Sequence, residues 1–302
     1  MPVCKHCGSS RIQRRGNGGQ GKIKIQCAEC GKYSRIVEFQ TTGANNKYRS
    51  ARILLLDIET SLMKFYGFSP KMEYVPHELM IMDWSILCWG AKWLFESEVM
   101  GQSVTPQEAI MRKDDSILGG IWDLINQADI VITQNGINFD IKKLKSRFLL
   151  AGYSPPSPFM NVDTLKVSRE VFGWSYNRLD ALGMKFGIGR KSDMEIEDWI
   201  YCSEGSQEHL TKMFEYCKRD VAPLLEEVYL RMLPWIPNHP NLGLYTDHDA
   251  DVCPKCESQS LKWGETYPTP AGLWEGFRCE ACGAVGRGKG KLNKIKGVNV
   301  TN

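Results

Sequence analysis

Two acidic residues lie at the end of a short apolar segment, Ile53–Thr60. An apolar run of this length, bounded by polar residues, is typical of a buried central strand. Asp57 and Glu59 are two residues apart, so a strand directs both side chains to the same face of its sheet. Two carboxylates crowded on one face repel each other unless a cation lies between them. The segment therefore predicts a cation site, and solvated acids at a strand end are the plain alternative.

Two later segments supply further polar residues in positions that suit such a site. Ile130–Thr133 is a second apolar run, and Asp140 follows it where the predicted strand gives way to an amphipathic helix. In α/β sheets, functional loops lie at this kind of boundary. Tyr216 and Asp220 are four residues apart in a long predicted helix, so they share one helix face, about 6 Å apart along the axis.

A cluster of carboxylates with a neighbouring tyrosine suits metal-dependent cleavage of a phosphodiester bond. Hydrolysis develops negative charge on the attacking and the leaving oxygen, and two divalent ions about 3.5–4 Å apart can stabilise both. Hard ions such as Mg²⁺ and Mn²⁺ prefer carboxylate and water ligands. We therefore expect these acids to hold two Mg²⁺ or Mn²⁺ ions.

Four acids, in this order and in these contexts, resemble the three motifs of the DEDD 3′–5′ exonucleases of the DnaQ-like, ribonuclease H-like superfamily: Asp57, Glu59, Asp140 and Asp220. Tyr216 marks the DEDDy branch, which includes the proofreading domains of DNA polymerases. The resemblance implies that Asp57, Glu59 and Asp220 hold the ion that activates water. It also implies that Asp57 bridges to a second ion, which Asp140 reaches directly or through water. Tyr216 would orient the nucleophilic water, because its ordinary pKa of about 10 makes it a poor base by itself.

The same resemblance suggests four substrate contacts: Thr60, Leu62, Asn135 and Asp163. In the family, an apolar side chain after the first motif packs against the 3′-terminal base, and Leu62 or Phe65 would do so here; burial in the core is the alternative. Asn135 would support the loop or contact a phosphate. Asp163 is similar to an auxiliary aspartate of polymerase-type relatives, and a helix cap is the competing interpretation.

Both ends of the chain carry paired cysteines with zinc-ligand spacing. The first set is Cys4, Cys7, Cys27 and Cys30, and the second is Cys253, Cys256, Cys279 and Cys282. Two CxxC pairs in one short segment are typical of a structural zinc site with four thiolate ligands. We therefore expect two structural Zn²⁺ ions, each in a small zinc ribbon that depends on the metal for folding.

Charge is distributed unevenly along the 302 residues. Residues 1–40 contain eight Lys and Arg against two acids, and residues 251–302 contain eight against five. Since the whole chain has a formal net charge of +3, the middle is left at −6. An acidic nuclease core repels a nucleic-acid backbone unless metals and basic appendages compensate. The ends therefore read as basic appendages to the core.

Several features bear on compartment and partners. No segment approaches the length of an apolar membrane span, and the start of the chain does not resemble a signal peptide. With cysteines that suit metal binding, these features predict a cytoplasmic protein, in the host cytoplasm if a phage encodes it. The expected partner is nucleic acid, with DNA preferred over RNA. A replication or repair protein is a further candidate partner, and no association with a membrane is expected.

Together the patterns predict an α/β protein whose ribonuclease H-like mixed sheet has flanking helices, with two small Cys₄ zinc ribbons. The expected domains are an N-terminal ribbon (1–40), a linker (41–51), a DEDDy exonuclease domain (52–233), a linker (234–250), a C-terminal ribbon (251–286) and a basic tail (287–302). The expected activity is metal-dependent 3′–5′ exonucleolysis of single-stranded DNA or DNA 3′ ends, releasing nucleoside 5′-monophosphates. A structure-specific endonuclease, an RNA exonuclease on the same fold, and a non-catalytic zinc-ribbon adaptor that binds nucleic acid remain alternatives.

Overall fold

The computed structural model describes residues 7, 12–19, 22–30, 32–37, 50–189, 193–246, 248 and 250–292. The chain divides into two units, Met1–Arg49 and Ser50–Asn302, and each is described by itself. Cys4, one of the eight cysteines expected to bind zinc, lies outside the described residues.

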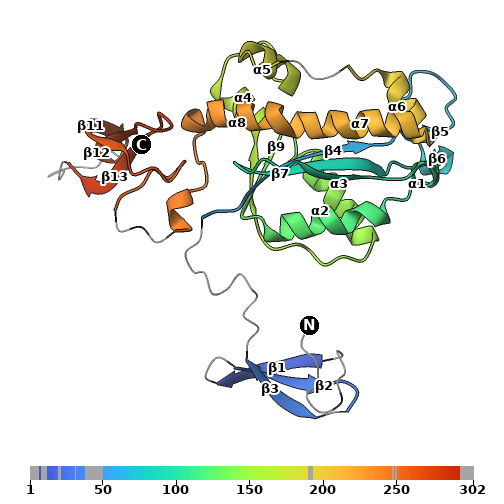
Figure 1. Cartoon of the computed structure of the whole chain (residues 1–302), viewed down its shortest axis with the longest axis horizontal. Coiled ribbons are helices and arrows are strands. Elements are labelled where there is room, and N and C mark those ends of the chain that lie inside the picture. The colour runs from blue at the N-terminus through green and yellow to red at the C-terminus, as the bar shows by residue number, and fades with distance from the viewer. Residues whose placement is uncertain are drawn as a thin grey trace. The chain divides into compact units, whose positions relative to one another are not determined.

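A five-stranded mixed sheet forms the centre of the larger unit (Figure 1). Its strands, in spatial order, are β10 (Met160–Asp163), β9 (Ile130–Thr133), β4 (Ile53–Thr60), β7 (Ile86–Trp93) and β8 (Met100–Ser103). β4, β7 and β8 pair antiparallel, whereas β4, β9 and β10 pair parallel. The predicted central strand is thus confirmed, and β7 and β8 follow it as an antiparallel meander.

Helices cover both faces of this sheet. In Figure 1, α7 (Gln207–Arg219) and α8 (Glu226–Met232) run along one face, and α2 (Asp115–Gln127) and α3 (Asp140–Leu150) lie on the other. The remaining α-helices are α1 (Pro106–Met111), α4 (Thr164–Val171), α5 (Leu179–Lys185) and α6 (Ile196–Ser203). Among the described residues, none of these helices has the length and apolar character needed to cross a membrane.

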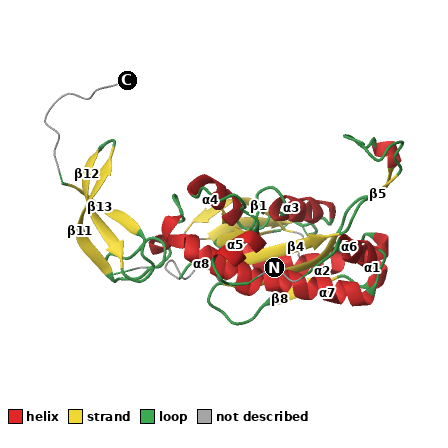
Figure 2. Ribbon diagram, turned by 90° about the horizontal axis from the view of Figure 1, so that it is seen from above, coloured by secondary structure: helices red, strands yellow, loops and turns green. Residues whose placement is uncertain are grey.

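A small hairpin that the sequence pattern did not reveal follows β4. It consists of β5 (Lys64–Phe65) and β6 (Met80–Met82), and it stands at the edge of the domain in Figure 2. Its base is fixed to the C-terminal end of α6, where the Leu62 N–H donates to Ser203 Oγ at 3.1 Å. Strands this short, with both residues of β5 exposed, lack the alternating apolar pattern that predicts a strand.

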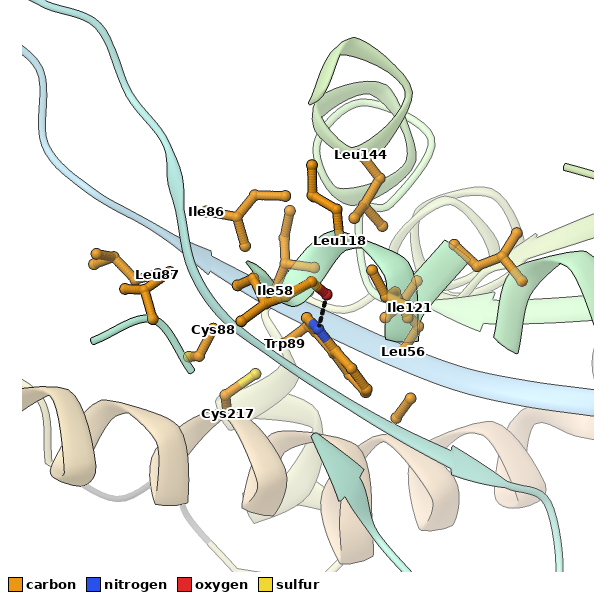
Figure 3. Close-up of a cluster of buried hydrophobic side chains, with 14 of the residues drawn as sticks. Leu56, Ile58, Ile86, Leu87, Cys88, Trp89, Leu118, Ile121, Leu144 and Cys217 are labelled. Carbon is orange, nitrogen blue, oxygen red and sulfur yellow. Dashed lines mark hydrogen bonds between the residues drawn. The ribbon is translucent and has the colours of Figure 1, made fainter. Parts of the chain in front are cut away.

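The side chains of β4 alternate between two cores, as expected for a strand buried on both faces. Leu56 and Ile58 belong to a cluster with Trp89 and with residues of α2 and α3 (Figure 3). Within this cluster, Trp89 Nε1 donates to the carbonyl of Ile117 at 2.8 Å. Leu55 belongs to the second cluster, with residues of α5 and α8. The strand that bears the acids is therefore held on both sides.

Three cysteines outside the zinc-type pairs lie in the core: Cys88, Cys202 and Cys217. Burial raises the pKa of all three thiols, for Cys202 to about 12. They are therefore neutral thiols at physiological pH, and Cys217 Sγ donates to the backbone carbonyl of Asp57 at 3.4 Å.

The sequence pattern predicts one helix over 207–232, kinked at Pro223, whose ring clashes with the preceding turn. The structure confirms the break. α7 ends at Arg219, a π-helical segment spans Asp220–Leu225, and Ala222 within it has a non-helical φ of −142° and ψ of 125°. Asp220 is the first residue of this distorted segment and is buried.

Each end of the chain contains a three-stranded antiparallel sheet. The N-terminal sheet has β1 (Ile12–Gly19), β2 (Lys22–Cys27) and β3 (Tyr33–Val37). The C-terminal sheet has β11 (Leu261–Thr269), β12 (Gly272–Cys279) and β13 (Val285–Lys291).

Two predicted boundaries need correction. The expected tail at 287–302 begins inside β13, because alternating glycines disguise this strand as a loop. The expected linker 234–250 is partly packed: Ile236 and Leu242 are buried in the cluster that contains α8. Lys255, next to the zinc-type cysteines, donates to the carbonyls of Pro234 and Ile236 at 2.8 and 2.7 Å, which ties the C-terminal sheet to the domain.

Candidate active site

Three of the four predicted acids converge. Carboxylate oxygens of Asp57, Glu59 and Asp220 all lie within 4.8 Å of one another. Asp57 and Glu59 come from β4, and Asp220 comes from the segment that follows α7. Octahedral coordination of Mg²⁺ at about 2.1 Å places ligand oxygens roughly 3–4 Å apart, so these oxygens need only small adjustments to share an ion. The donor set therefore fits a hard divalent cation.

Two glycines allow α7 to approach β4 closely enough for this convergence. Gly90 on β7 is paired with Asp57 on one side and with Gly101 on the other. A Cβ atom at Gly90 would lie 3.2 Å from the Cys217 carbonyl oxygen and 3.3 Å from Lys218 Cα. At Gly101 a Cβ atom would lie 2.6 Å from the Phe214 ring. The backbone of α7 thus rests directly on the sheet between Tyr216 and Asp220.

Asp140 lies beside the three acids and is not a member of their group. It is the buried first residue of α3, and its Oδ1 accepts from the Ile58 N–H at 3.0 Å. β9 pairs with β4 only along Ile53–Leu55, so the first turn of α3 takes the place beside Ile58 that a longer β9 would fill. Ile58 is the residue between Asp57 and Glu59, so this hydrogen bond links Asp140 to the backbone that carries both acids.

Tyr216 lies one helical turn before Asp220, as predicted, and only 8% of its surface is exposed. Its ring meets the Trp199 ring edge-on, with the centroids 6.2 Å apart. Tyr216 also lines a cavity of about 890 Å³. The tyrosine therefore connects the carboxylate group with a space large enough for a ligand.

The cavity beside Tyr216 is predominantly polar. Its lining includes the amide side chains Gln134, Asn135 and Asn177, the exposed arginines Arg169 and Arg178, and the acids Asp180, Asp193 and Glu195. Amides and arginines are suitable donors to phosphate and sugar oxygens. Neither arginine is predicted from the sequence, because a lone arginine in a helical or loop segment carries no spacing signal.

Asp163 holds the turn that leads from β9 to Asp140. It is the N-cap of α4, and its carboxylate accepts from the backbone N–H groups of Leu165, Lys166, Asn135 and Ile137. The helix-cap interpretation is therefore correct, with an added function in holding the turn after β9. Asn135 has a left-handed φ of +70° in this turn and lines the cavity.

The other two predicted substrate contacts flank the end of β4. Thr60 is the last residue of β4 and is partly exposed. Leu62 is partly exposed, and its backbone is fixed by Ser203 Oγ and by Arg112, which donates to its carbonyl at 3.3 Å. Phe65, its alternative, is 43% exposed on β5.

The cysteine clusters fit zinc by their geometry. All four sulfurs of Cys253, Cys256, Cys279 and Cys282 lie within 4.8 Å of one another, with separations of 3.7 Å for Cys253 and Cys282 and 3.6 Å for Cys256 and Cys279. A tetrahedral site with Zn–S bonds of 2.3 Å requires sulfurs about 3.8 Å apart. In the N-terminal unit, Cys7, Cys27 and Cys30 form a similar group, with Cys7 and Cys27 at 3.5 Å.

A family match supports the fold. A family model described as the RNase_H superfamily matches residues 98–230, a range that includes Asp140, Tyr216 and Asp220. A search of curated proteins found no match. Among solved structures, the chain is similar to the family B DNA polymerase from the hyperthermophilic archaeon Pyrobaculum calidifontis, with a TM-score of 0.44 and 16% identity. The alignment covers 74% of this chain and 29% of the polymerase chain. The mixed sheet with its flanking helices, supported by the family match over residues 98–230, is a ribonuclease H-like fold.

Proposed function

We propose that this protein is a metal-dependent 3′–5′ exonuclease that hydrolyses single-stranded DNA, or DNA 3′ ends, to nucleoside 5′-monophosphates. The observation that carries the proposal is the convergence of Asp57, Glu59 and Asp220, with Tyr216 one turn before Asp220 at the wall of a large polar cavity. Acidic residues with a purely structural function at strand and helix ends are not expected to cluster this closely, because their negative charges repel one another.

In this proposal, Asp57, Glu59 and Asp220 hold divalent ions, and Asp140 completes the set from the N-terminus of α3. When bound, Mg²⁺ or Mn²⁺ would supply the activation of water and the stabilisation of charge on the attacking and leaving oxygens. Burial of Asp220 and Asp140 keeps competing water away from these carboxylates. The contact from Asp140 to the Ile58 N–H fixes one of its oxygens and the orientation of the other.

Tyr216 has the position of a residue that orients the attacking water. Its ring is held by Trp199, and its helix is held against the sheet at Gly90 and Gly101. The hydroxyl can therefore hold a hydrogen bond in a fixed direction without having to move at the time of reaction. Tyr216 is proposed as a positioning group, and the proton of the attacking water would pass to solvent.

The cavity is the proposed place of the substrate strand. Its volume of about 890 Å³ is in the range of sites that enclose nucleotide-sized ligands. Arg178 precedes the first turn of α5 and Arg169 is in the last turn of α4, so both present guanidinium groups to the same opening. Because such contacts are made to phosphate, they would support binding of any base sequence.

A cleavage assay with end-labelled oligonucleotides tests the proposal. Single-stranded DNA, duplex DNA and RNA, labelled at either end, are incubated with Mg²⁺ or Mn²⁺ and with the wild type or Asp57→Ala. We expect a 5′-labelled DNA strand to shorten one nucleotide at a time, and a 3′-labelled strand to release labelled mononucleotide at once. Asp57→Ala should abolish both.

Each other outcome replaces the proposal with a specific alternative. Discrete internal cuts would indicate a structure-specific endonuclease, and faster shortening of RNA would indicate an RNA exonuclease. Tight binding with no cleavage by the wild type in either metal would indicate a nucleic-acid-binding adaptor. Persistent cleavage by Asp57→Ala would show that the carboxylate group is not the site of reaction.

A further inference from the structure

The last strand of the C-terminal sheet has an unusual composition. β13 reads Val285-Gly286-Arg287-Gly288-Lys289-Gly290-Lys291, so glycine and a cation alternate along it. Alternate residues of a strand point to opposite faces of the sheet. β13 is also an edge strand, paired only with β12. One of its faces therefore carries the cations and the other carries none.

The glycine face packs against the aromatic core of this small sheet. A Cβ atom at Gly286 would lie 2.4 Å from the Phe277 ring, and one at Gly288 would lie 3.2 Å from the Trp263 ring. Phe277 and Trp263 pack together with their centroids 5.2 Å apart. A side chain at Gly286 would displace the Phe277 ring, and one at Gly288 would crowd the Trp263 ring. Strand alternation then places Arg287 and Lys289 on the opposite face.

That opposite face is cationic and includes an aromatic ring. Arg287 and Lys289 are both exposed, and the Arg287 guanidinium lies 3.9 Å from the centre of the Trp274 ring. The Trp274 indole is itself fixed, because Nε1 donates to Thr269 Oγ1 at 2.9 Å. Stacking on a fixed ring holds a guanidinium in one orientation while its donors remain available to solvent.

Neighbouring strands extend this cationic face. Arg278 and Lys262 are paired with each other on β12 and β11, and both are exposed. Among the described residues, Glu265 is the acid in register on this face, and it lies 3.3 Å from Arg278. We name the set Lys262, Arg278, Arg287 and Lys289 the ribbon cationic face.

We propose that the ribbon cationic face is a second binding site, which holds the phosphate backbone of single-stranded nucleic acid. Cations at every second residue of a strand lie about 7 Å apart in a row, which suits a polyanion with regularly repeated charges better than a single small anion. The residues between the two ends of the chain carry a net charge of −6, so attraction for a polyanion has to come from the ends. The proposal takes the nature of its ligand from the proposed function but does not depend on cleavage.

Direct binding measurements with the full, zinc-loaded chain test this site. A fluorescent single-stranded oligonucleotide is titrated in the absence of Mg²⁺ and Mn²⁺, and its anisotropy gives the affinity at several salt concentrations. The double variant Arg287→Ala/Lys289→Ala should bind about 10-fold more weakly, and the slope of log K against log[salt] should decrease by about 1.4 for two lost phosphate contacts.

Two matched double variants separate a local site from general charge. Arg287→Lys/Lys289→Arg keeps both charges and should retain both the affinity and the slope. Lys142→Ala/Lys145→Ala removes two exposed cations from α3 and should leave both nearly unchanged. Zinc content and circular dichroism of each variant show that the C-terminal sheet is folded.

The proposal is overturned if Arg287→Ala/Lys289→Ala binds like the wild type, or if removal of the two α3 lysines weakens binding equally. Binding of anionic lipid vesicles or acidic peptides by this face, with no loss of oligonucleotide binding on its removal, would overturn it as well. Cleavage of a short oligonucleotide is measured in parallel and should be unaffected by the ribbon substitutions. If the wild type binds as expected but cleaves nothing, the proposed function fails and the second site stands.

Discussion

Replacement of Gly90 with alanine tests how the sheet and α7 bring the acids together. The new methyl group would lie 3.2 Å from the Cys217 carbonyl oxygen and 3.3 Å from Lys218 Cα, closer than ordinary van der Waals contact. Both atoms belong to the backbone of α7, so no side chain can rotate away. The helix must instead move from the sheet by a few tenths of an ångström, and Asp220 moves with its end.

The effects of this movement on the free energy of unfolding and on kcat can be approximated separately. Overpacking a core by one methyl group costs about 1–3 kcal/mol, partly offset by the smaller entropy of the unfolded chain when alanine replaces glycine. We therefore expect the free energy of unfolding to fall by about 1–2 kcal/mol. Since misplacement by 1 Å can lower a rate by about 100-fold, a shift of a few tenths should lower kcat by about 3- to 10-fold.

Denaturant titration and single-turnover cleavage measure the two effects separately. Gly173→Ala is the control, because a Cβ atom there meets nothing within 4 Å, and it should leave both stability and rate almost unchanged. Raising the Mn²⁺ concentration should partly restore the rate of Gly90→Ala if the carboxylates are displaced. Wild-type stability and wild-type kcat in Gly90→Ala would refute the account of how α7 is seated.

Three further predictions concern other parts of the chain. Arg178→Ala should raise KM for single-stranded DNA about 5- to 10-fold with little change in kcat, because a phosphate contact is lost away from the reacting bond. Steady-state kinetics measure both constants, and an unchanged KM would exclude the cavity as the binding site of the strand. Cys253→Ser should lower the zinc content from two ions per chain to one, as measured by elemental analysis, and unfold the C-terminal sheet, as measured by near-UV circular dichroism. Retention of two zinc ions would contradict the Cys₄ assignment. Burial lowers the pKa of His239 from 6.5 to about 4, and its Nδ1–H donates to the Pro240 carbonyl while Nε2 accepts from the Tyr229 hydroxyl. Because the folded state disfavours the proton, stability is complete above pH 6.5 and is lost as the pH falls toward 4, so the free energy of unfolding should decrease by about 1–2 kcal/mol between pH 7 and 5. His239→Gln should show less of this decrease, and an identical pH profile would contradict it.

The parts of the fold that the sequence predicted are those with a strong local signal. β4 is an uninterrupted apolar run, the carboxylates on it are two residues apart, and Tyr216 and Asp220 share a helix face, so periodicity alone assigned their elements. The break at Pro223 and the two cysteine clusters could also be predicted from local sequence. A proline ring breaks a helix, and CxxC pairs have the spacing of zinc ligands.

The parts that escaped prediction depend on residues far apart in the sequence. Gly90 and Gly101 matter because α7 lies against them, and nothing in their own strands reveals that helix. The basic composition of 287–302 predicts a tail, and only the nearby rings of Trp263 and Phe277 explain why glycines lie in β13. Arg169 and Arg178 come together only when α4 and α5 are placed around the cavity.

Asp57, Glu59 and Asp220 are proposed to form the metal site at which a phosphodiester bond is hydrolysed. The most direct test is a Mn²⁺ titration of the single-turnover cleavage rate, with a 5′-labelled single strand and zinc-loaded wild type or Asp220→Asn. The wild-type rate should rise with Mn²⁺ and saturate, whereas Asp220→Asn should need a higher Mn²⁺ concentration and remain more than about 100-fold slower at saturation, because loss of a direct ligand exceeds the effect of losing a supporting contact. Equal rates and equal Mn²⁺ dependence of the two proteins would contradict the claim.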